Sequence, residues 1–196
     1  MLLDKLQNFH LYLASQSPRR KELLQGMGIH FEILSTHVPE VYPEGLQPEE
    51  IVEYLSHLKL STIQQDKYPD NSIFIACDTI VVLHNQILGK PKSKEEAITM
   101  LQNLSGKEHT VMSGVTVLSP KGFQTAHRNT TVKFRTISDE EIHYYVNQYA
   151  PLDKAGAYGV QEWIGYVGID YIEGSYYNVM GLPTKLLWEM LEKAVQ

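Results

Sequence analysis

Apolar positions along this chain follow the two-residue period of strands in some segments and the period of helices, three to four residues, in others. The segments that favour strands are 10–15, 31–35, 73–83, 111–118, 130–136 and 166–172. Those that favour helices are 18–26, about 49–65, 93–104, 138–148 and 183–193. Because strands alternate with helices but also follow one another directly, we expect an α/β fold with a mixed sheet.

Local signals support several of these boundaries. Ser17 can cap the first predicted helix, and Pro18 suits its first position. The sequences 93–96 and 138–141 each match the capping box that opens a helix. No repeat, low-complexity segment or linker interrupts the pattern, so residues 1–196 are expected to form a single domain.

Composition and charge narrow the class of protein. The 196 residues are 43% hydrophobic and 20% charged, as in a soluble globular protein, and the net charge of −6 argues against a nucleic-acid partner. No apolar run approaches the roughly 20 residues that cross a bilayer, so no membrane partner is expected. The one cysteine, Cys77, fits a reducing compartment, and the N-terminal residues lack a signal-peptide core, so cytoplasm is the expected location.

Two of the four arginines, Arg19 and Arg20, lie in the first turn of the helix predicted from residue 18. Cations are disfavoured at this end of the helix dipole, whereas anions are bound there by free N–H groups. Two guanidinium groups at the same place indicate a site for an anion, and phosphate is the usual one.

Asp78 interrupts the strongest β segment, 73–83. A carboxylate among apolar residues is costly to bury without a cation or hydrogen-bond donors. It is therefore either a metal ligand or general base at the end of a strand, or the centre of a bulge or local turn.

Two further segments could bind a nucleotide. Lys90 lies between Gly89 and Pro91 and could bind phosphate, although a solvated loop lysine has the same pattern. Residues 153–161 combine small residues with Gln161, whose amide could recognise a base edge, although an ordinary tight turn explains them equally well.

Taken in order, the segments Leu13–Arg20, Asp78–Val81, Gly89–Pro91, Asp153–Gly159 and Gly174–Ser175 with Asn178–Pro183 resemble the motifs of the Maf family of nucleotide pyrophosphatases. The resemblance covers nearly the whole chain. It implies an elongated mixed sheet flanked by helices, forming two lobes with a deep cleft. Family members are often dimers, so the protein partner that the resemblance implies is a second copy of this chain, in a homodimer.

The resemblance also implies an activity, the hydrolysis of a nucleoside triphosphate to its monophosphate and pyrophosphate with a divalent cation, Mg²⁺ or Mn²⁺. The branch that acts on dTTP and UTP is the most similar, since its pattern has arginine, threonine and glutamine where this chain has Arg20, Thr79 and Gln161. Modified pyrimidine nucleotides are included in this expectation.

By the same matching, four residues are expected to be catalytic: Asp78, as proton acceptor or organiser of the metal, with Glu40, Lys59 and Lys90. Asp78 and Glu40 are the expected metal ligands. The expected substrate-binding residues are Ser17, Arg19, Arg20, Thr79 and Gln161. This chain departs from the family pattern at Ser56 and Leu60, where the helix motif around Lys59 has alanine, and at Glu162, where glycine is frequent.

Two alternatives remain open at this point. One is a nucleotide-sensing regulator of septum formation and cell division, which would bind triphosphate with little turnover. The other is the same reaction on 7-methyl-GTP or another base.

Overall fold

The computed structural model describes residues 1–36 and 38–196. Within these residues the strands are β1 (His10–Leu13), β2 (Glu32–Ile33), β3 (Ser72–Leu83), β4 (Gln86–Leu88), β5 (Glu108–Ser119), β6 (Gly122–Phe134) and β7 (Ile169–Glu173). The α-helices are α1 (Leu2–Leu6), α2 (Pro18–Gly26), α3 (Pro48–Ser61), α4 (Lys94–Leu104), α5 (Asp139–Tyr149), α6 (Trp163–Gly168), α7 (Tyr176–Met180) and α8 (Thr184–Ala194). Short 3₁₀ turns are η1 (Gln65–Lys67) and η2 (Ala155–Ala157).

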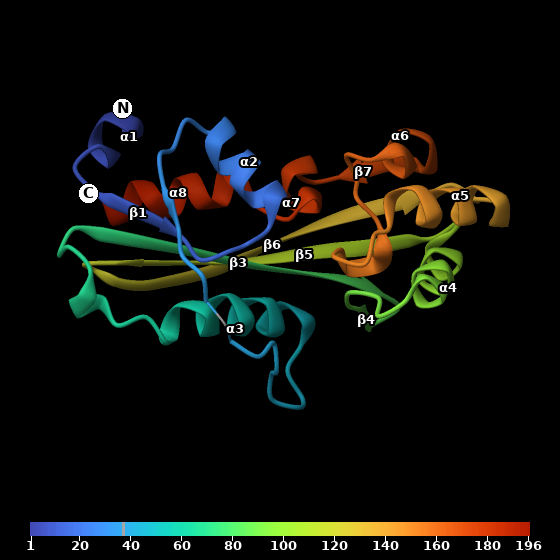
Figure 1. The fold of residues 1–196 in the computed structure, drawn as a ribbon, viewed down its shortest axis with the longest axis horizontal. Coiled ribbons are helices and arrows are strands. Elements are labelled where there is room, and N and C mark those ends of the chain that lie inside the picture. Colours follow the sequence, from blue (N-terminus) through green and yellow to red (C-terminus); the bar gives the residue numbers. More distant parts are fainter. Residues whose placement is uncertain (37) are drawn as a thin grey trace. The chain divides into compact units, whose positions relative to one another are not determined.

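The described strands form one seven-stranded sheet in the order β2-β1-β3-β5-β6-β7, with β4 paired to β3 (Figure 1). β1 runs parallel to both β2 and β3, whereas the pairs β3–β4 and β6–β7 are antiparallel. The mixed α/β sheet flanked by helices that the sequence predicts is therefore confirmed. None of the described helices has the length and apolar content needed to span a bilayer.

The chain divides into two compact units. The first comprises residues 1–78, 113–128 and 181–196, and the second comprises 79–112 and 129–180. Strands β3, β5 and β6 each contribute to both units. The expectation of one domain over residues 1–196 stays a prediction, as do the elongated shape and the cleft.

In the first unit, α3 covers one face of the sheet, and α2 and α8 cover the other (Figure 1). The α3 side of the core joins Tyr12 of β1, Phe74 of β3 and Leu60 of α3. α3 packs closely against β5 because residue 114 is glycine: a Cβ there would lie 2.2 Å from the carbonyl oxygen of Val52. The missing side chain therefore sets how near α3 lies to the sheet.

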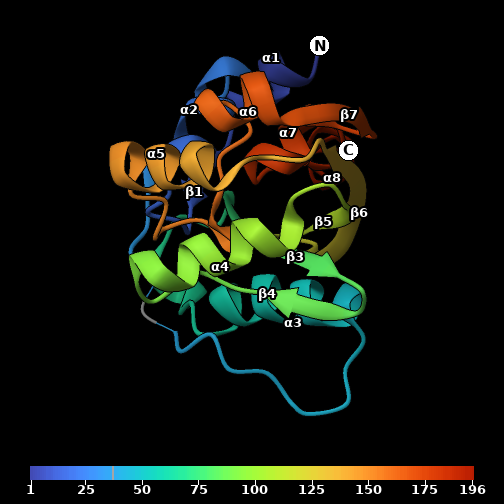
Figure 2. The ribbon, with the colours of Figure 1, turned by 90° about the vertical axis from the view of Figure 1, so that its right-hand side faces the viewer.

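The second unit contains the hairpin of β3 and β4, followed by α4 (Figure 2). His84 and Asn85 both adopt positive φ, 48° and 64°, as the two-residue turn of a tight hairpin requires. Later in the chain, η2 and α6 lead into β7. α4 and α5 begin at Ser93 and Ser138, whose hydroxyls accept hydrogen bonds from the N–H groups of Glu96 and Glu141.

Candidate active site

Strand alternation directs Asp78 toward helix α3. Phe74 and Ala76 of β3 pack in the same core cluster as Leu60 of α3. Since alternate residues of a strand share a face, Asp78 is the next residue of this series. Its Oδ1 meets the Nζ of Lys59, which precedes Leu60 on α3. The aspartate that interrupts the apolar strand is thus paired with a cation.

Lys59 links three oxygen groups. Besides Asp78, its Nζ lies 3.2 Å from Oε1 of Glu40 and 3.4 Å from the carbonyl oxygen of Cys77. The side chains of Lys59 and Asp78 are 13% and 9% exposed, whereas that of Glu40 is 45% exposed. The nearly buried ammonium of Lys59 and the two carboxylates therefore form a compact charged cluster. Solvent reaches this cluster at Glu40.

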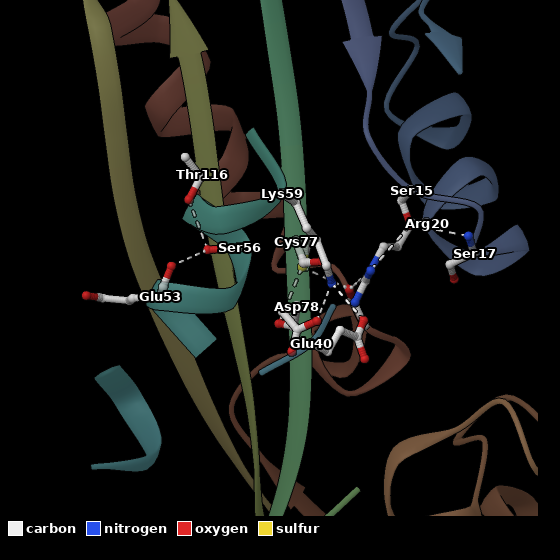
Figure 3. Close-up of polar contacts among 11 residues, drawn as sticks. Ser15, Ser17, Arg20, Glu40, Glu53, Ser56, Lys59, Cys77, Asp78 and Thr116 are labelled. Carbon is white, nitrogen blue, oxygen red and sulfur yellow. Dashed lines mark hydrogen bonds and ion pairs between the residues drawn. The ribbon is translucent and has the colours of Figure 1, made fainter. Parts of the chain in front are cut away.

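Arg20 belongs to α2, the helix on the face of the sheet opposite α3 (Figure 1). Its Nε donates to the carbonyl oxygen of Gly181 at 2.9 Å, and its Nη1 donates to Oγ of Ser15 at 3.3 Å. The buried thiol of Cys77 donates to the same Gly181 oxygen at 3.2 Å. The guanidinium is thereby fixed in orientation, and its end points toward Glu40, Lys59 and Asp78 (Figure 3).

Ser17 begins α2 through its backbone, with Pro18 in the first turn as predicted, but its hydroxyl makes no capping bond to the described residues. Ser17 is thus the N-cap residue of α2, as predicted, although the cap is made without its side chain. Its own N–H donates to Oγ of Ser15 at 3.2 Å. Arg19 and Arg20 follow in the first turn, as predicted, and both are half-buried. Their role in binding an anion stays a prediction.

Hydrogen bonds between α3 and the sheet help to position Lys59, and its sequence motif did not predict them. One turn before it, the buried Oγ of Ser56 lies 2.9 Å from Oγ1 of Thr116 on β5, which lies 3.0 Å from Oγ1 of Thr125 on β6. Ser56 also donates to the carbonyl oxygen of Glu53 at 2.9 Å (Figure 3). The serine that replaces the family's alanine therefore has a partner in the sheet.

The remaining candidates belong to the second unit. Thr79 follows Asp78 on β3 and is half-buried, and Lys90 is exposed beside Gly89, whose carbonyl oxygen accepts from the N–H of Gly156 at 3.1 Å. Gln161 is half-buried, but its Oε1 is buried and has no hydrogen-bond partner among the described residues. The structure thus brings Glu40, Lys59 and Asp78 into direct contact, and the roles of Thr79, Lys90 and Gln161 stay predictions.

The donor set for a metal ion is small. Among residues 1–36 and 38–196, no three His, Cys, Asp or Glu side chains form a group that could hold a metal. Asp78 and Glu40, however, both contact Lys59. Two carboxylates fit the way in which proteins hold Mg²⁺, through one or two carboxylates while water and substrate phosphates fill the other positions.

Sequence reasoning missed a further polar cluster in the second unit. Lys154, whose side chain is 9% exposed, lies 3.0 Å from Oε1 of Glu162 and 2.8 Å from Oδ1 of Asp153. The buried hydroxyl of Tyr145 donates to Oε2 of Glu162 and accepts the N–H of Gly159 at 3.0 Å. Asp153 and Lys154 lie in a segment that the family resemblance singles out, whereas the sign of Glu162 in the sequence is its place where glycine is frequent.

Comparison with known proteins identifies relatives over almost the whole chain. The Maf-like protein family model matches residues 10–194. A protein from Porphyromonas gingivalis named dTTP/UTP pyrophosphatase is 45% identical over 193 residues, covering 97% of each chain. A protein of the same name from Cytophaga hutchinsonii is 47% identical over 193 residues, covering 98% of this chain and 88% of its own.

A solved structure has a similar fold. The Ham1 protein of Staphylococcus aureus aligns with a TM-score of 0.51 and 16% sequence identity, covering 94% of this chain and 98% of its own. At that identity the likeness concerns the fold alone. The match of the family model to residues 10–194, together with relatives about 45% identical over nearly their full length, shows that this chain belongs to the Maf family.

Proposed function

We propose that this chain is a nucleoside triphosphate pyrophosphatase that converts dTTP and UTP to their monophosphates and pyrophosphate. The names of relatives 45–47% identical support the reaction and the substrates. The structural observation that carries the proposal is the cluster in which Lys59 joins Asp78 and Glu40. Modified pyrimidine nucleotides with the same base edge are included as substrates.

In the proposed reaction, the oxygen of a water molecule attacks the α-phosphorus, and the bond from that phosphorus to the bridging oxygen of the β-phosphate breaks. Pyrophosphate leaves with the electron pair of that bond. Asp78 orients the attacking water and accepts its proton, and Lys59 holds Asp78 in place. Most of the rate enhancement comes from positioning and charge.

The triphosphate carries several negative charges that cations must neutralise. We assign this role to Arg19, Arg20, Lys59 and Lys90. The hydrogen bonds from Arg20 to Gly181 and Ser15 support it, because a guanidinium fixed before the substrate arrives loses less conformational entropy on binding. Ser17, at the start of α2, contributes to the same phosphate site, where free N–H groups favour an anion.

Pyrophosphatases of this family generally use divalent metal ions, and we assign Asp78 and Glu40 as the side chains that would hold one. Mg²⁺ suits such carboxylate oxygens, with Mn²⁺ as a substitute. When bound, the ion supplies positive charge to the phosphate oxygens. For the base, we assign selectivity to Arg20, Thr79 and Gln161.

We further propose that the two compact units act together as one domain in the cytoplasm and that a homodimer is the state to test. The family model supports a single domain because its match, residues 10–194, runs through both units. Because the net charge is −6 and the proposed substrate is a free nucleotide, we expect neither a nucleic acid nor a membrane as a partner.

The deciding experiment measures pyrophosphate release from UTP, dTTP, CTP, ATP, GTP and 7-methyl-GTP, with and without Mg²⁺. We expect release from UTP and dTTP in the presence of Mg²⁺, and a loss of about 10³-fold in the Asp78→Asn variant with UTP binding retained. Asp66→Asn, at an exposed aspartate of η1, is the matched control and should keep full activity. Binding of UTP without release from any nucleotide would favour the nucleotide sensor.

A further inference from the structure

Glu162 lies at the centre of a buried polar network that joins both ends of the segment 153–162. Its Oε1 contacts the ammonium of Lys154, and its Oε2 accepts from the hydroxyl of Tyr145. Tyr145 also accepts the backbone N–H of Gly159, and the N–H of Glu162 donates to the carbonyl oxygen of Gly159 at 3.0 Å. The segment that contains Gln161 is therefore closed by hydrogen bonds on both sides of that residue.

The network makes Glu162 a fixed carboxylate. Lys154 is 9% exposed and Glu162 19% exposed, so the carboxylate of Glu162 depends on Lys154 for compensation, while Lys154 also pairs with the more exposed Asp153. Burial, together with the carboxylate of Glu162, raises the pKa of Tyr145 far above its usual range, so the hydroxyl stays protonated and donates a hydrogen bond to the carboxylate. With both oxygens of Glu162 engaged, the carboxylate has a single orientation.

Gln161 and Glu162 cover the same face of Gly159. A Cβ built on Gly159 would lie 2.8 Å from Cδ of Glu162 and 3.1 Å from Nε2 of Gln161, so both side chains need a glycine there. A carboxylate only accepts hydrogen bonds, so it favours the NH₂ end of a neighbouring amide and repels the oxygen end. Glu162 therefore favours the arrangement in which Nε2 lies over Gly159 and Oε1 points elsewhere.

The amide oxygen of Gln161 lacks a hydrogen-bond donor among the described residues. Oε1 of Gln161 is buried, and no described residue donates to it. A buried acceptor without a partner is unfavourable, and a ligand that supplies an N–H to it removes that cost. Uracil and thymine both present an N3–H between two carbonyl oxygens, whereas cytosine presents an acceptor at N3.

We propose that Glu162, held by Lys154 and Tyr145, is a positioning residue that orients the amide of Gln161 and so favours uracil and thymine over cytosine. The inference rests on the proposed function for its substrate class. It assigns no contact between Glu162 and the substrate. Because uracil and thymine share the same imide edge, the orientation of Gln161 does not distinguish UTP from dTTP.

The test compares kcat/KM for UTP, dTTP and CTP in four proteins: wild type, Glu162→Gln, Tyr145→Phe and Glu141→Gln. In Glu162→Gln the side chain keeps its size but can donate as well as accept, so we expect the UTP:CTP ratio to fall about tenfold, as for the loss of one oriented hydrogen bond. Tyr145→Phe keeps the pair with Lys154 and should lower the ratio about threefold. The UTP:dTTP ratio should stay within about twofold in all four.

Glu141→Gln is the matched control. Glu141 forms an ion pair with Arg135 at 2.6 Å in the same unit, so this variant also loses a paired carboxylate while the segment 153–162 is untouched. Its UTP:CTP ratio should equal that of the wild type. Thermal unfolding of each variant separates a loss of stability from a change in base selectivity, since a merely structural role would lower activity on all nucleotides alike.

A second measurement separates the two proposals. Titration of UMP and CMP by calorimetry reads the base preference without turnover, and the UMP:CMP affinity ratio should fall in Glu162→Gln as the kinetic ratio does. If the wild type releases pyrophosphate from no nucleotide, the proposed function is wrong, and these affinities still decide the role of Glu162. Unchanged UTP:CTP and UMP:CMP ratios in folded Glu162→Gln and Tyr145→Phe would overturn the inference.

Discussion

Lys59 is the residue on which the charge balance of the candidate site depends. Lysine is rarely buried unless it is paired, and here the ammonium contacts Asp78, Glu40 and the carbonyl oxygen of Cys77. The attraction between the ammonium and the carboxylates offsets the cost of removing Lys59 and Asp78 from water. Substitution of Lys59 therefore leaves the buried carboxylate of Asp78 without this cation, whereas substitution of Asp78 leaves Lys59 paired with Glu40.

Lys59→Met tests this balance directly. We expect the free energy of unfolding to fall by about 3 kcal/mol, because the buried carboxylate of Asp78 loses its cation. The double variant Lys59→Met/Asp78→Asn should recover most of that loss, since no buried charge is left. Urea denaturation of both variants checks the expectation, and additive losses in the double variant would contradict it.

Arg20 is predicted to bind the triphosphate rather than the base alone. In Arg20→Ala we expect KM for UTP to rise about tenfold or more, while the affinity for UMP changes much less, because the charge-assisted bonds to the outer phosphates are lost. The matched control is Arg128→Ala, which removes a more exposed arginine 3.9 Å from Glu189. Steady-state kinetics and calorimetry provide the two values, and equal losses for UTP and UMP would argue against the phosphate role.

At the scale of single elements, local pattern predicted the structure where one physical signal dominated. The helix 18–26 and the strand 73–83 were predicted to within one residue, because proline at the helix start and a dense run of apolar residues leave few alternatives. The strand expected at 166–172 is partly wrong. Residues 163–168 form α6, and β7 begins at Ile169.

The error at α6 has a local backbone cause. Tyr166 and Val167 favour a strand, but the N–H of Gly165 donates to the carbonyl oxygen of Glu162 at 2.8 Å, and a Cβ at Gly165 would lie 1.8 Å from the carbonyl oxygen of Val160. These contacts between backbone atoms leave no mark on the pattern of apolar and polar side chains from which the strand was predicted. β4 was missed because its three residues are too few to show a period.

Gly114 determines how closely α3 approaches the sheet, and with it the position of Lys59. In Gly114→Ala the new Cβ would lie 2.2 Å from a backbone oxygen of α3, so the helix must move. We expect a loss of about 2 kcal/mol or more in the free energy of unfolding and a fall in kcat. Gly26→Ala, with nothing within 4 Å of the new Cβ, should be nearly neutral in both, and denaturation with UTP kinetics measures the pair.

At the scale of the whole molecule, the candidate site could not be predicted from spacing. Lys59 and Asp78 are 19 positions apart and meet only because α3 packs on the face of β3 that carries Asp78. Resemblance to the Maf family named Lys59, Asp78 and Glu40 as site residues, and the structure adds that they are in contact. The anchoring of Arg20 by Ser15 and Gly181 had no signal in the sequence, because a carbonyl oxygen 161 positions away leaves no pattern of side chains.

His109 makes the stability of the molecule depend on pH. It lies on β5 and is 3% exposed, with Nε2 2.7 Å from the hydroxyl of Tyr158 and ring contacts to Phe134 and Tyr158. Its buried Nδ1 has no partner among the described residues. Burial therefore lowers the pKa of His109 from its ordinary value of 6.5 to about 4.

Between these two values the unfolded chain binds a proton at His109 that the folded chain does not bind. The free energy of unfolding should therefore fall as the pH drops from about 6.5 to about 4, by about 3 kcal/mol from this group, with no further loss below that range. In His109→Gln this dependence of the free energy of unfolding on pH should be absent, although the variant is less stable than the wild type at neutral pH. His143→Gln, at an exposed histidine of α5, should keep the wild-type slope. Urea denaturation at half-unit steps from pH 7.5 to 4 measures all three proteins, and parallel curves for wild type and His109→Gln would show that a buried His109 does not control the acid response.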